Sequence, residues 1–363
     1  MGNFNLTKMA VNIHCPGNVV QLDDAGLPSI LVWIPAFKLS DVLNTDDDSI
    51  HPAFIVNGRQ IPGFYYSKYE NVVYNGKAYS LPAENPAANV HFDEARQSCE
   101  NKGYGWHLST AAEWAAIALW CKKNGFIPLG NNHNGRDISE SEIKAIPVTY
   151  NNDGVISKVA TGTGPLTWSH DNTTAGIWDL NGNMNEWQGG LRLVWGELQI
   201  LANNDAADPD NPQNQTSTCW KAINASDGSL VDPESKTTDT AVKTSGNTVK
   251  LDNVGGVLTY ATGVTTIITE EASSTFEKIT CTASVGEAAK VLLRALALLP
   301  DEGETEYGAD LVYYANGRAE CGVFRGGSNT YGVSSGLFSM RATYTRETRG
   351  VGVGFRSAYI PNI

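Results

Sequence analysis

The pentapeptide Gly332-Val-Ser-Ser-Gly336 matches G-x-S-x-G, the pattern that holds the nucleophilic serine of many hydrolases. That serine needs a sharp turn between a strand and a helix of a parallel α/β sheet, and no strand–helix alternation surrounds this motif. The six histidines show no paired spacing typical of zinc sites. We therefore interpret the motif as a coincidence, and His107 as a packed or hydrogen-bonded side chain, not a catalytic base.

Metal and thiol chemistry find little support in the spacing of the residues. Asp179, Asn183 and Glu186 offer the oxygen ligands that Ca²⁺ prefers, but such residues more often satisfy the backbone groups of loops. The six cysteines include no Cys-x-x-Cys pair, and we expect them to be reduced and buried. The sequence predicts no cofactor and no bound metal.

Charge is distributed unevenly along the chain. The net charge of −13 disfavours binding to nucleic acid, whose phosphates repel an acidic protein. From Arg318 to Ile363, however, six Arg and two acidic residues give a net charge of +4. Some of these Arg are expected to tie loops together through backbone carbonyls, and others to form a surface distinct from the body. No apolar run is long enough to span a membrane, and residues 1–20 lack the apolar core of a secretion signal.

Several elements can be predicted from periodicity and turn residues. Apolar spacing predicts helices over residues 90–102 and 109–123, the second capped by Ser109 or Thr110. Short apolar runs such as residues 29–35 and 64–69, separated by Asn-Gly turns, predict a sheet of short strands.

A long central segment differs in composition from the rest of the chain. Residues 199–310 are rich in Thr, Ser and Asp, with a hairpin predicted near 253–256 and a helix over 285–299. Apolar and Gly patterning resumes at Leu311. We interpret residues 199–310 as an insertion, residues 1–28 as an N-terminal segment, and residues 29–363 as one domain.

Five segments outside residues 199–310 resemble the formylglycine-generating-enzyme family, also called sulfatase-modifying factors, which is a branch of the C-type-lectin fold. The resemblance lies in five segments that follow the family's order: Trp33–Phe37, Phe64–Glu70, Trp106–Trp114, Gly176–Trp187, and the Arg-Gly-Gly-Ser and Gly-Phe-Arg pair at 325–328 and 354–356. It implies an α+β, C-type-lectin-like domain of mixed short strands with two main helices and a large insertion.

The same resemblance argues against the family's catalysis. The enzymes bind copper through two Cys between these last two motifs, and residues 328–353 contain no Cys. Thiolates are the ligands that a soft metal needs, so the chain is not expected to be an enzyme. A formylglycine-generating-type oxidase stays as a disfavoured alternative, and a structural virion component as another.

The C-terminal part looks more like the variable protein of a diversity-generating retroelement of the gut-phage type. In that family a reverse transcriptase rewrites codons between fixed positions, and Arg325-Gly-Gly, Gly336-Leu-Phe, Arg346 and Gly354-Phe-Arg match those positions. Asn329 stands where the family has Trp, Ser335 where it has Ala, and Ala342 where it has Leu. The resemblance implies a hypervariable, receptor-binding or adhesin-type surface within residues 325–356.

Spacing in this region agrees with such a surface. Apolar Phe338, Met340 and Ala342 alternate with Ser339, Arg341 and Thr343, so one face of a strand is expected to be buried and the other open. The predicted ligand-binding residues are those on the open face and in the flanking loops: Ser328, Thr330, Tyr331, Val333, Ser334, Ser339, Arg341, Thr343, Tyr344, Glu347, Thr348, Arg349, Gly350 and Val351. Without the resemblance, an ordinary edge strand followed by a Gly-rich loop, with solvated Tyr and Arg side chains, is the better explanation of the pattern.

The resemblance also implies partners and a location. The expected ligand is a protein or other molecule on a bacterial cell surface, with no nucleic acid and no membrane insertion. A homo-oligomer or contacts with virion tail components fit the same family. The expected location is the virion, in a phage tail, or the cytoplasm before assembly.

Overall fold

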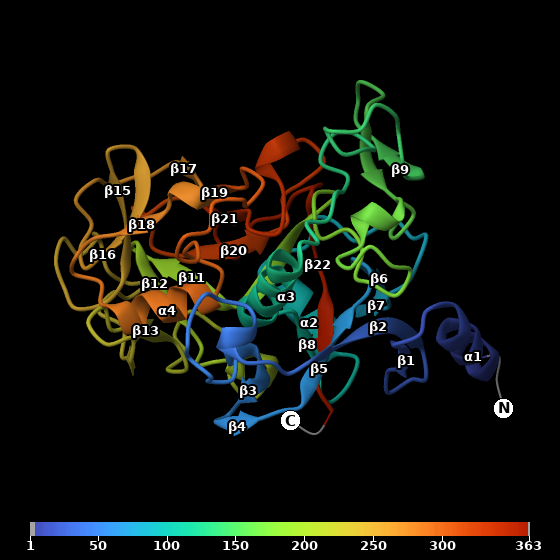
Figure 1. The fold of residues 1–363 in the computed structure, drawn as a ribbon, viewed down its shortest axis with the longest axis horizontal. Helices are drawn as coiled ribbons and strands as arrows, with labels where there is room; N and C mark the ends of the chain where they lie inside the picture. Colours follow the sequence, from blue (N-terminus) through green and yellow to red (C-terminus); the bar gives the residue numbers. More distant parts are fainter. Residues whose placement is uncertain (1–3, 362–363) are drawn as a thin grey trace.

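A computed structural model describes residues 4–361 as a mixed α/β structure built on two sheets. Most of the larger sheet lies on one side of helix α3 (Ala111–Asn124), and helix α1 (Phe4–His14) with the strands nearest to it lies on the other (Figure 1). None of the helices in these residues has the length and apolar character that crossing a bilayer requires.

The smaller sheet has five strands in the order β1-β2-β5-β23-β8. Their bounds are β1 Asn18–Leu22, β2 Pro28–Pro35, β5 Gly63–Ser67, β23 Ser357–Tyr359 and β8 Trp106–Leu108. The last strand of the chain thus lies inside this sheet, paired on both sides.

The larger sheet has twelve strands, of which nine follow the order β17-β19-β21-β20-β11-β12-β15-β16-β18. The bounds are β11 Asn185–Val194, β12 Glu197–Ile200, β13 Lys221–Ile223, β14 Leu230–Val231, β15 Lys250–Val254, β16 Val257–Ala261, β17 Ala272–Thr275, β18 Thr280–Cys281, β19 Leu311–Tyr314, β20 Cys321–Arg325, β21 Met340–Ala342 and β22 Val353–Phe355. β21 lies between β19 and β20, and β22 pairs in parallel with β11.

Three further strand pairs lie outside these sheets. They are β3 Ile55–Val56 with β4 Arg59–Gln60, β6 Asn71–Tyr74 with β7 Lys77–Ser80, and β9 Pro147–Tyr150 with β10 Ile156–Val159. The Asn-Gly turns of the first two pairs have positive φ at both residues, 49° and 73° at Asn57-Gly58, which suits tight hairpins. The predicted turns are confirmed.

The part of the chain that the structure describes contains four α-helices: α1 Phe4–His14, α2 Phe92–Glu100, α3 Ala111–Asn124 and α4 Glu287–Ala295. The helices predicted over 90–102, 109–123 and 285–299 are confirmed. Each starts two residues later than predicted, and the first and third end earlier than predicted, at Glu100 and Ala295. α1 has no counterpart among the sequence predictions.

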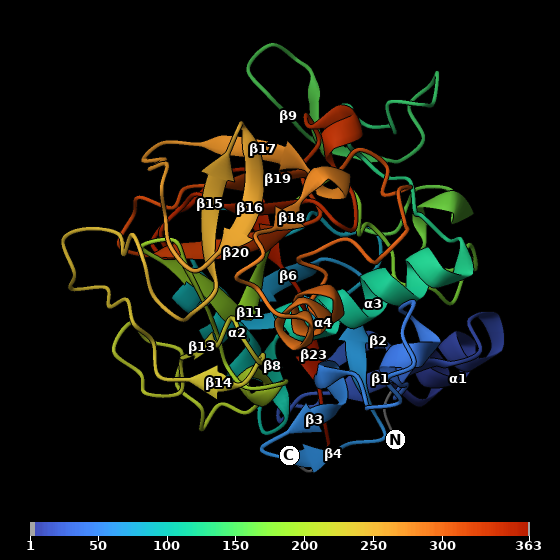
Figure 2. The same ribbon diagram turned by 60° about the vertical axis from the view of Figure 1, so that its left-hand side comes forward.

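Helix α3 is the central packing element. Thr110 caps its start by accepting the N–H of Glu113, while the Glu113 carboxylate accepts the N–H of Thr110, and Gly125 ends it in the left-handed region. Nearly all its side chains are buried, and α4 lies beside it (Figure 2). The indole Nε1 of Trp114 donates to the carbonyl of Leu337 at 2.8 Å, which fixes the C-terminal segment on this helix.

The predicted N-terminal segment (residues 1–28) and the predicted insertion (residues 199–310) are both joined to the rest of the protein by strand pairing. The boundary predicted at residue 29 falls in the hairpin of β1 and β2. Residues 199–310, predicted as an insertion, start inside β12 and supply β13 to β18, which extend the larger sheet.

Candidate functional site

Two buried arginines fix the ends of the C-terminal segment. Arg325, at the end of β20, donates from Nη2 to the carbonyls of Leu296 and Ala297 at 3.3 and 3.1 Å. Arg356 pairs through Nε with both carboxylate oxygens of Glu186 at 2.9 Å, and both side chains are fully buried. The expectation that some C-terminal arginines are structural is confirmed.

The inward side chains of the segment are packed in the main core. Phe338, Met340 and Ala342 are at most 2% exposed. The Phe338 ring lies 4.9 Å from Phe276 and 4.7 Å from Tyr307, centroid to centroid. The predicted buried half of the alternation is therefore confirmed, and its partners come from the segment 199–310.

The predicted open half is only partly open. Ser328, Ser339 and Thr343 are 6%, 3% and 2% exposed, so their placement on the open surface is wrong. The Ser339 N–H donates to the Gly336 carbonyl in a tight turn beside Asp310, whose carboxylate accepts the next N–H back along the chain.

Thr343 and Ser328 are covered by other loops. The Thr343 carbonyl accepts from Arg318 Nη1 at 2.5 Å, so the Arg318 side chain lies across the end of β21. Ser328 lies beneath the turn at Gly352. The strands that flank β21, β19 and β20, precede it in the C-terminal region, and the alternation within residues 337–343 does not predict which side chains these strands place beside it.

Arg341 forms the centre of an aromatic cluster at the surface. Its guanidinium carbon lies 4.3 Å from the ring centroid of Tyr313, 5.3 Å from that of Tyr331 and 5.5 Å from that of Tyr344. We call these four residues the Arg341 patch. Arg341 Nη1 also pairs with Glu271 at 3.0 Å. Each cation–π contact contributes about 0.5–1 kcal/mol at a half-exposed site, so the rings and the cation hold one another in place.

The Arg341 patch is accessible to a ligand chiefly through Tyr344. This residue is 39% exposed, whereas the Arg341 side chain is about 12% exposed and its Nε is buried without a hydrogen-bond partner among residues 4–361. Burial raises the pKa of Tyr331, so its hydroxyl stays protonated at neutral pH and is hydrogen-bonded to Asn185. Tyrosine and arginine held in this way present large contact areas and hydrogen-bond donors with little conformational freedom left to lose.

A turn over residues 347–351 borders the Arg341 patch. Asn185 donates its N–H to the Gly352 carbonyl at 2.8 Å, and this links the turn to Tyr331. Arg349 forms two hydrogen bonds with Glu94, at 2.5 and 2.6 Å, which lower the pKa of that carboxyl. Val351, at 74% exposed, stands at the crest of the turn.

The structure therefore distributes the fourteen predicted residues over three environments. Tyr331, Arg341 and Tyr344 meet in the Arg341 patch. The residues beside it, on the 3₁₀ turn at Gly332–Ser334 and on the turn 347–351, are exposed or half-buried: Thr330, Val333, Ser334, Glu347, Thr348, Arg349, Gly350 and Val351. The remaining three are the buried Ser328, Ser339 and Thr343.

Sequence reasoning missed three members of the site. Tyr313 lies on β19, where buried Val312 and Tyr314 alternate with half-buried Leu311 and Tyr313, so the same period-two pattern was available there. Glu271 and Asn185 reach the site only through long-range pairing, and no local signal marks them.

The residues considered as candidates for catalysis have structural roles instead. Ser334 ends a 3₁₀ turn and not a strand–helix elbow. His107 is buried and bonded through Nε2 to Glu113 at 2.8 Å, as predicted for a packed histidine. Burial raises the pKa of the Cys321 thiol to about 12, so it stays protonated and unreactive at neutral pH.

The candidate calcium ligands Asp179 and Asn183 form hydrogen bonds within the fold, although Asp179 Oδ1 has no partner among the described residues. Asp179 accepts the N–H of Gly162 at 2.8 Å, and Asn183 donates to the Val159 carbonyl and to Glu70. Within residues 4–361 no group of three or more His, Cys, Asp or Glu is placed to hold a metal ion. All six cysteines are free, three buried and three half-buried, so the prediction of reduced thiols is confirmed and that of burial only in part.

No protein-family model and no curated protein sequence matches the chain. Among solved structures it is similar to Treponema denticola variable protein 1, at 12% identity and a TM-score of 0.36 over 95% of this chain and 100% of the other. It is also similar to PvdO from Pseudomonas aeruginosa (13%, TM-score 0.30, 92% and 94% covered) and to the Major Tropism Determinant P3c variant (8%, TM-score 0.29, 94% and 71% covered). TM-scores this low do not establish a shared fold, so the function must be inferred from the chain's own residues.

Proposed function

We propose that this chain is a ligand-binding protein whose binding surface is the Arg341 patch with the exposed residues of the two adjacent turns. The observation that carries the proposal is the division of one short segment into two sets. Phe338, Met340 and the two end arginines are buried, whereas Arg341 and Tyr344 lie at the surface a residue or a few residues away. Exposed positions usually change stability by no more than about 0.5 kcal/mol when substituted, so the exposed positions of this surface tolerate variation. Substitution of the half-buried Arg341 is expected to cost more, because it contacts three rings and Glu271.

The proposed biological role follows from the sequence resemblance. A diversity-generating retroelement, in a phage or prophage, would rewrite the outward positions and leave the buried ones unchanged. The ligand would be a protein or other molecule on a bacterial surface. In this role the chain acts as a receptor-binding or adhesin-type protein and not as an enzyme.

We propose a smaller set of positions open to diversification than the sequence suggests. Six of the fourteen predicted residues are exposed and five are half-buried, and the three buried ones are excluded from the proposed surface. Tyr313 and Glu271 support Arg341 from outside the segment and would remain constant.

Two matched libraries test the proposal. The first randomises Tyr331, Arg341 and Tyr344, and the second randomises Ser328, Ser339 and Thr343. Most members of the first library are expected to fold, as judged by protease resistance on a display platform, and some are expected to bind new bacterial strains. Few members of the second library are expected to resist protease. Equal loss of folding in both libraries would contradict the proposal, as would a first library in which no binder emerges from a broad panel of cells.

A further inference from the structure

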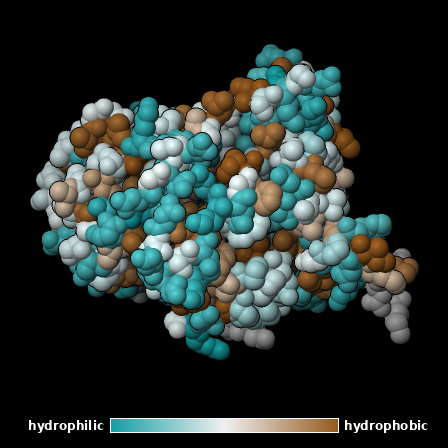
Figure 3. Space-filling model, viewed as in Figure 1, coloured by the Kyte–Doolittle hydropathy of each residue, from teal (hydrophilic) through white to brown (hydrophobic). Residues whose placement is uncertain are grey.

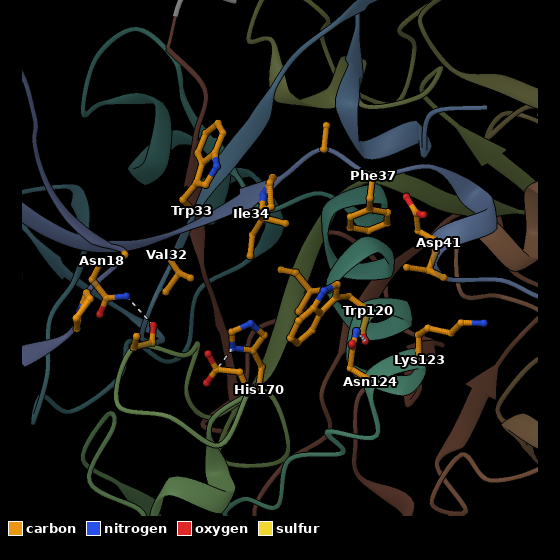
Figure 4. A pocket seen from close by; sticks show the side chains of 18 residues that line it. Asn18, Val32, Trp33, Ile34, Phe37, Asp41, Trp120, Lys123, Asn124 and His170 are labelled. Carbon is orange, nitrogen blue, oxygen red and sulfur yellow. Dashed lines mark hydrogen bonds and ion pairs between the residues drawn. The ribbon is translucent and has the colours of Figure 1, made fainter. Parts of the chain in front are cut away.

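A separate cavity of about 510 Å³ lies between β2, α3 and the loop at residues 170–175 (Figure 4). None of the residues of the Arg341 patch or of its adjacent turns lines it. Its size falls within the range of about 300–1,000 Å³ that is typical of small-molecule sites. It therefore stands apart from the proposed binding surface.

Apolar and aromatic side chains form one part of the cavity wall. Val32 and Ile34 project from β2, and the rings of Phe37 and Trp120 border the space beyond them (Figure 4). Trp120 is held by Phe126, which stacks on it with centroids 5.9 Å apart and the ring planes 17° from parallel. The walls thus present flat, partly fixed π surfaces to whatever enters.

His170 supplies one oriented polar group to the cavity. Only 6% of the residue is exposed, and its ring lies 5.4 Å from that of Trp120, centroid to centroid. Its Nδ1 accepts the N–H of Ile177 at 2.8 Å, so in the neutral ring the proton is on Nε2. Nε2 has no hydrogen-bond partner within residues 4–361, and the ring lines the cavity (Figure 4).

Charges of both signs line the cavity. Asp171 lies beside His170, whereas Asp41 and Lys123 lie on the opposite side (Figure 4). Burial lowers the pKa of His170 to about 4, so the ring itself is uncharged at neutral pH. An uncharged ligand that accepts one hydrogen bond matches this set of groups.

We propose that this cavity binds a small uncharged aromatic compound whose carbonyl oxygen accepts the proton of His170 Nε2 while its ring packs against Trp120 and Phe37. Burial of the ring supplies the affinity, and the single fixed donor sets the orientation. The cavity is a second site, and it does not depend on the function proposed for the Arg341 patch.

Acetophenone and ethylbenzene are matched probes, because they share the ring and differ in the carbonyl. Isothermal titration of the full chain is expected to show one acetophenone bound per chain, about five- to tenfold tighter than ethylbenzene. His170→Phe should remove this preference, and Trp120→Ala should weaken both probes. Tyr344→Ala, in the Arg341 patch, should leave both unchanged.

Each outcome bears on the proposal. His170→Phe removes the acceptor of the Ile177 N–H, and the variant could unfold for that reason. In that case the proposal is tested by the preference of the unsubstituted protein for acetophenone and by the effect of Trp120→Ala. Equal affinity for the two probes, or no effect of Trp120→Ala, would overturn the proposal.

Occupation of the cavity by a second copy would overturn it as well. Leu6, Met9 and Ile13 are each more than half exposed on α1, the helix at the right-hand edge of Figure 1. The same edge of the molecule shows hydrophobic surface in Figure 3. If sedimentation shows dimers that acetophenone does not dissociate and that exclude it, the cavity is an interface. The libraries of the Arg341 patch report on a different surface, so the two proposals fail independently.

Discussion

Truncation of Phe338 to alanine is expected to destabilise the protein by about 3–5 kcal/mol, the cost of emptying a buried aromatic site. Phe338 is 1% exposed and lies within 5 Å, centroid to centroid, of both Phe276 and Tyr307. Those two rings would lose their shared partner, and the space left cannot refill without moving the segment 199–310. Phe338→Leu keeps most of the volume and should cost less than about 1.5 kcal/mol.

The assay is urea unfolding followed by tryptophan fluorescence and circular dichroism in parallel, since coincident transitions justify a single free energy. Tyr344→Ala is the matched control, six residues away, and should cost no more than about 1 kcal/mol because that ring is 39% exposed. A Tyr344→Ala variant as unstable as Phe338→Ala would refute the division of the segment into buried and outward sets.

Three further outcomes are expected. Ser339→Arg, which forces a charge into a buried turn, should destabilise by about 3 kcal/mol or more, whereas Ser334→Arg on the adjacent half-exposed turn should leave the urea midpoint nearly unchanged. Burial raises the pKa of Asp310 to about 8, so the stability that its neutral form contributes is complete below about pH 4 and is lost as pH rises through 8. Between pH 6 and pH 8 the unsubstituted protein should therefore lose about 2 kcal/mol of unfolding free energy that the Asp310→Asn variant does not lose. The measurement is the unfolding free energy of both proteins at both pH values. An equal loss in the two proteins would contradict the assignment. Arg349→Ala removes a solvent-exposed ion pair, and its urea midpoint should match that of the unsubstituted protein at both low and high salt.

Local sequence patterns predicted the helices and strands of this fold well, but they did not predict which residues pack against them. Capping residues placed α3 to within two residues, and the alternation after Leu337 identified Phe338 and Met340 as buried. The same alternation could not show that Ser339 and Thr343 are buried too, because period two separates two faces without specifying what covers the second. Arg318 donates to the Thr343 carbonyl and Asp310 accepts the N–H of Phe338, and both lie more than twenty residues earlier in the chain.

The candidate site and the cavity depend even more on long-range contacts. Glu271 reaches Arg341 because β17 pairs with β19, which pairs with β21. His170 and Trp120 are fifty residues apart, and neither carries a motif that would single it out. α1 was missed because an eleven-residue helix is marginal by itself and depends on contacts outside it, here with β1.

The position of β23 has a consequence for how the protein is made. This strand is the last of the chain, yet it fills the slot between β5 and β8, and the adjacent Arg356 bonds oxygens of Glu186, Lys68 and Asp179. During synthesis the ribosome must therefore finish residues 325–356 before the smaller sheet can close. A stop codon anywhere in this stretch would yield a chain that cannot complete its core and is open to proteases.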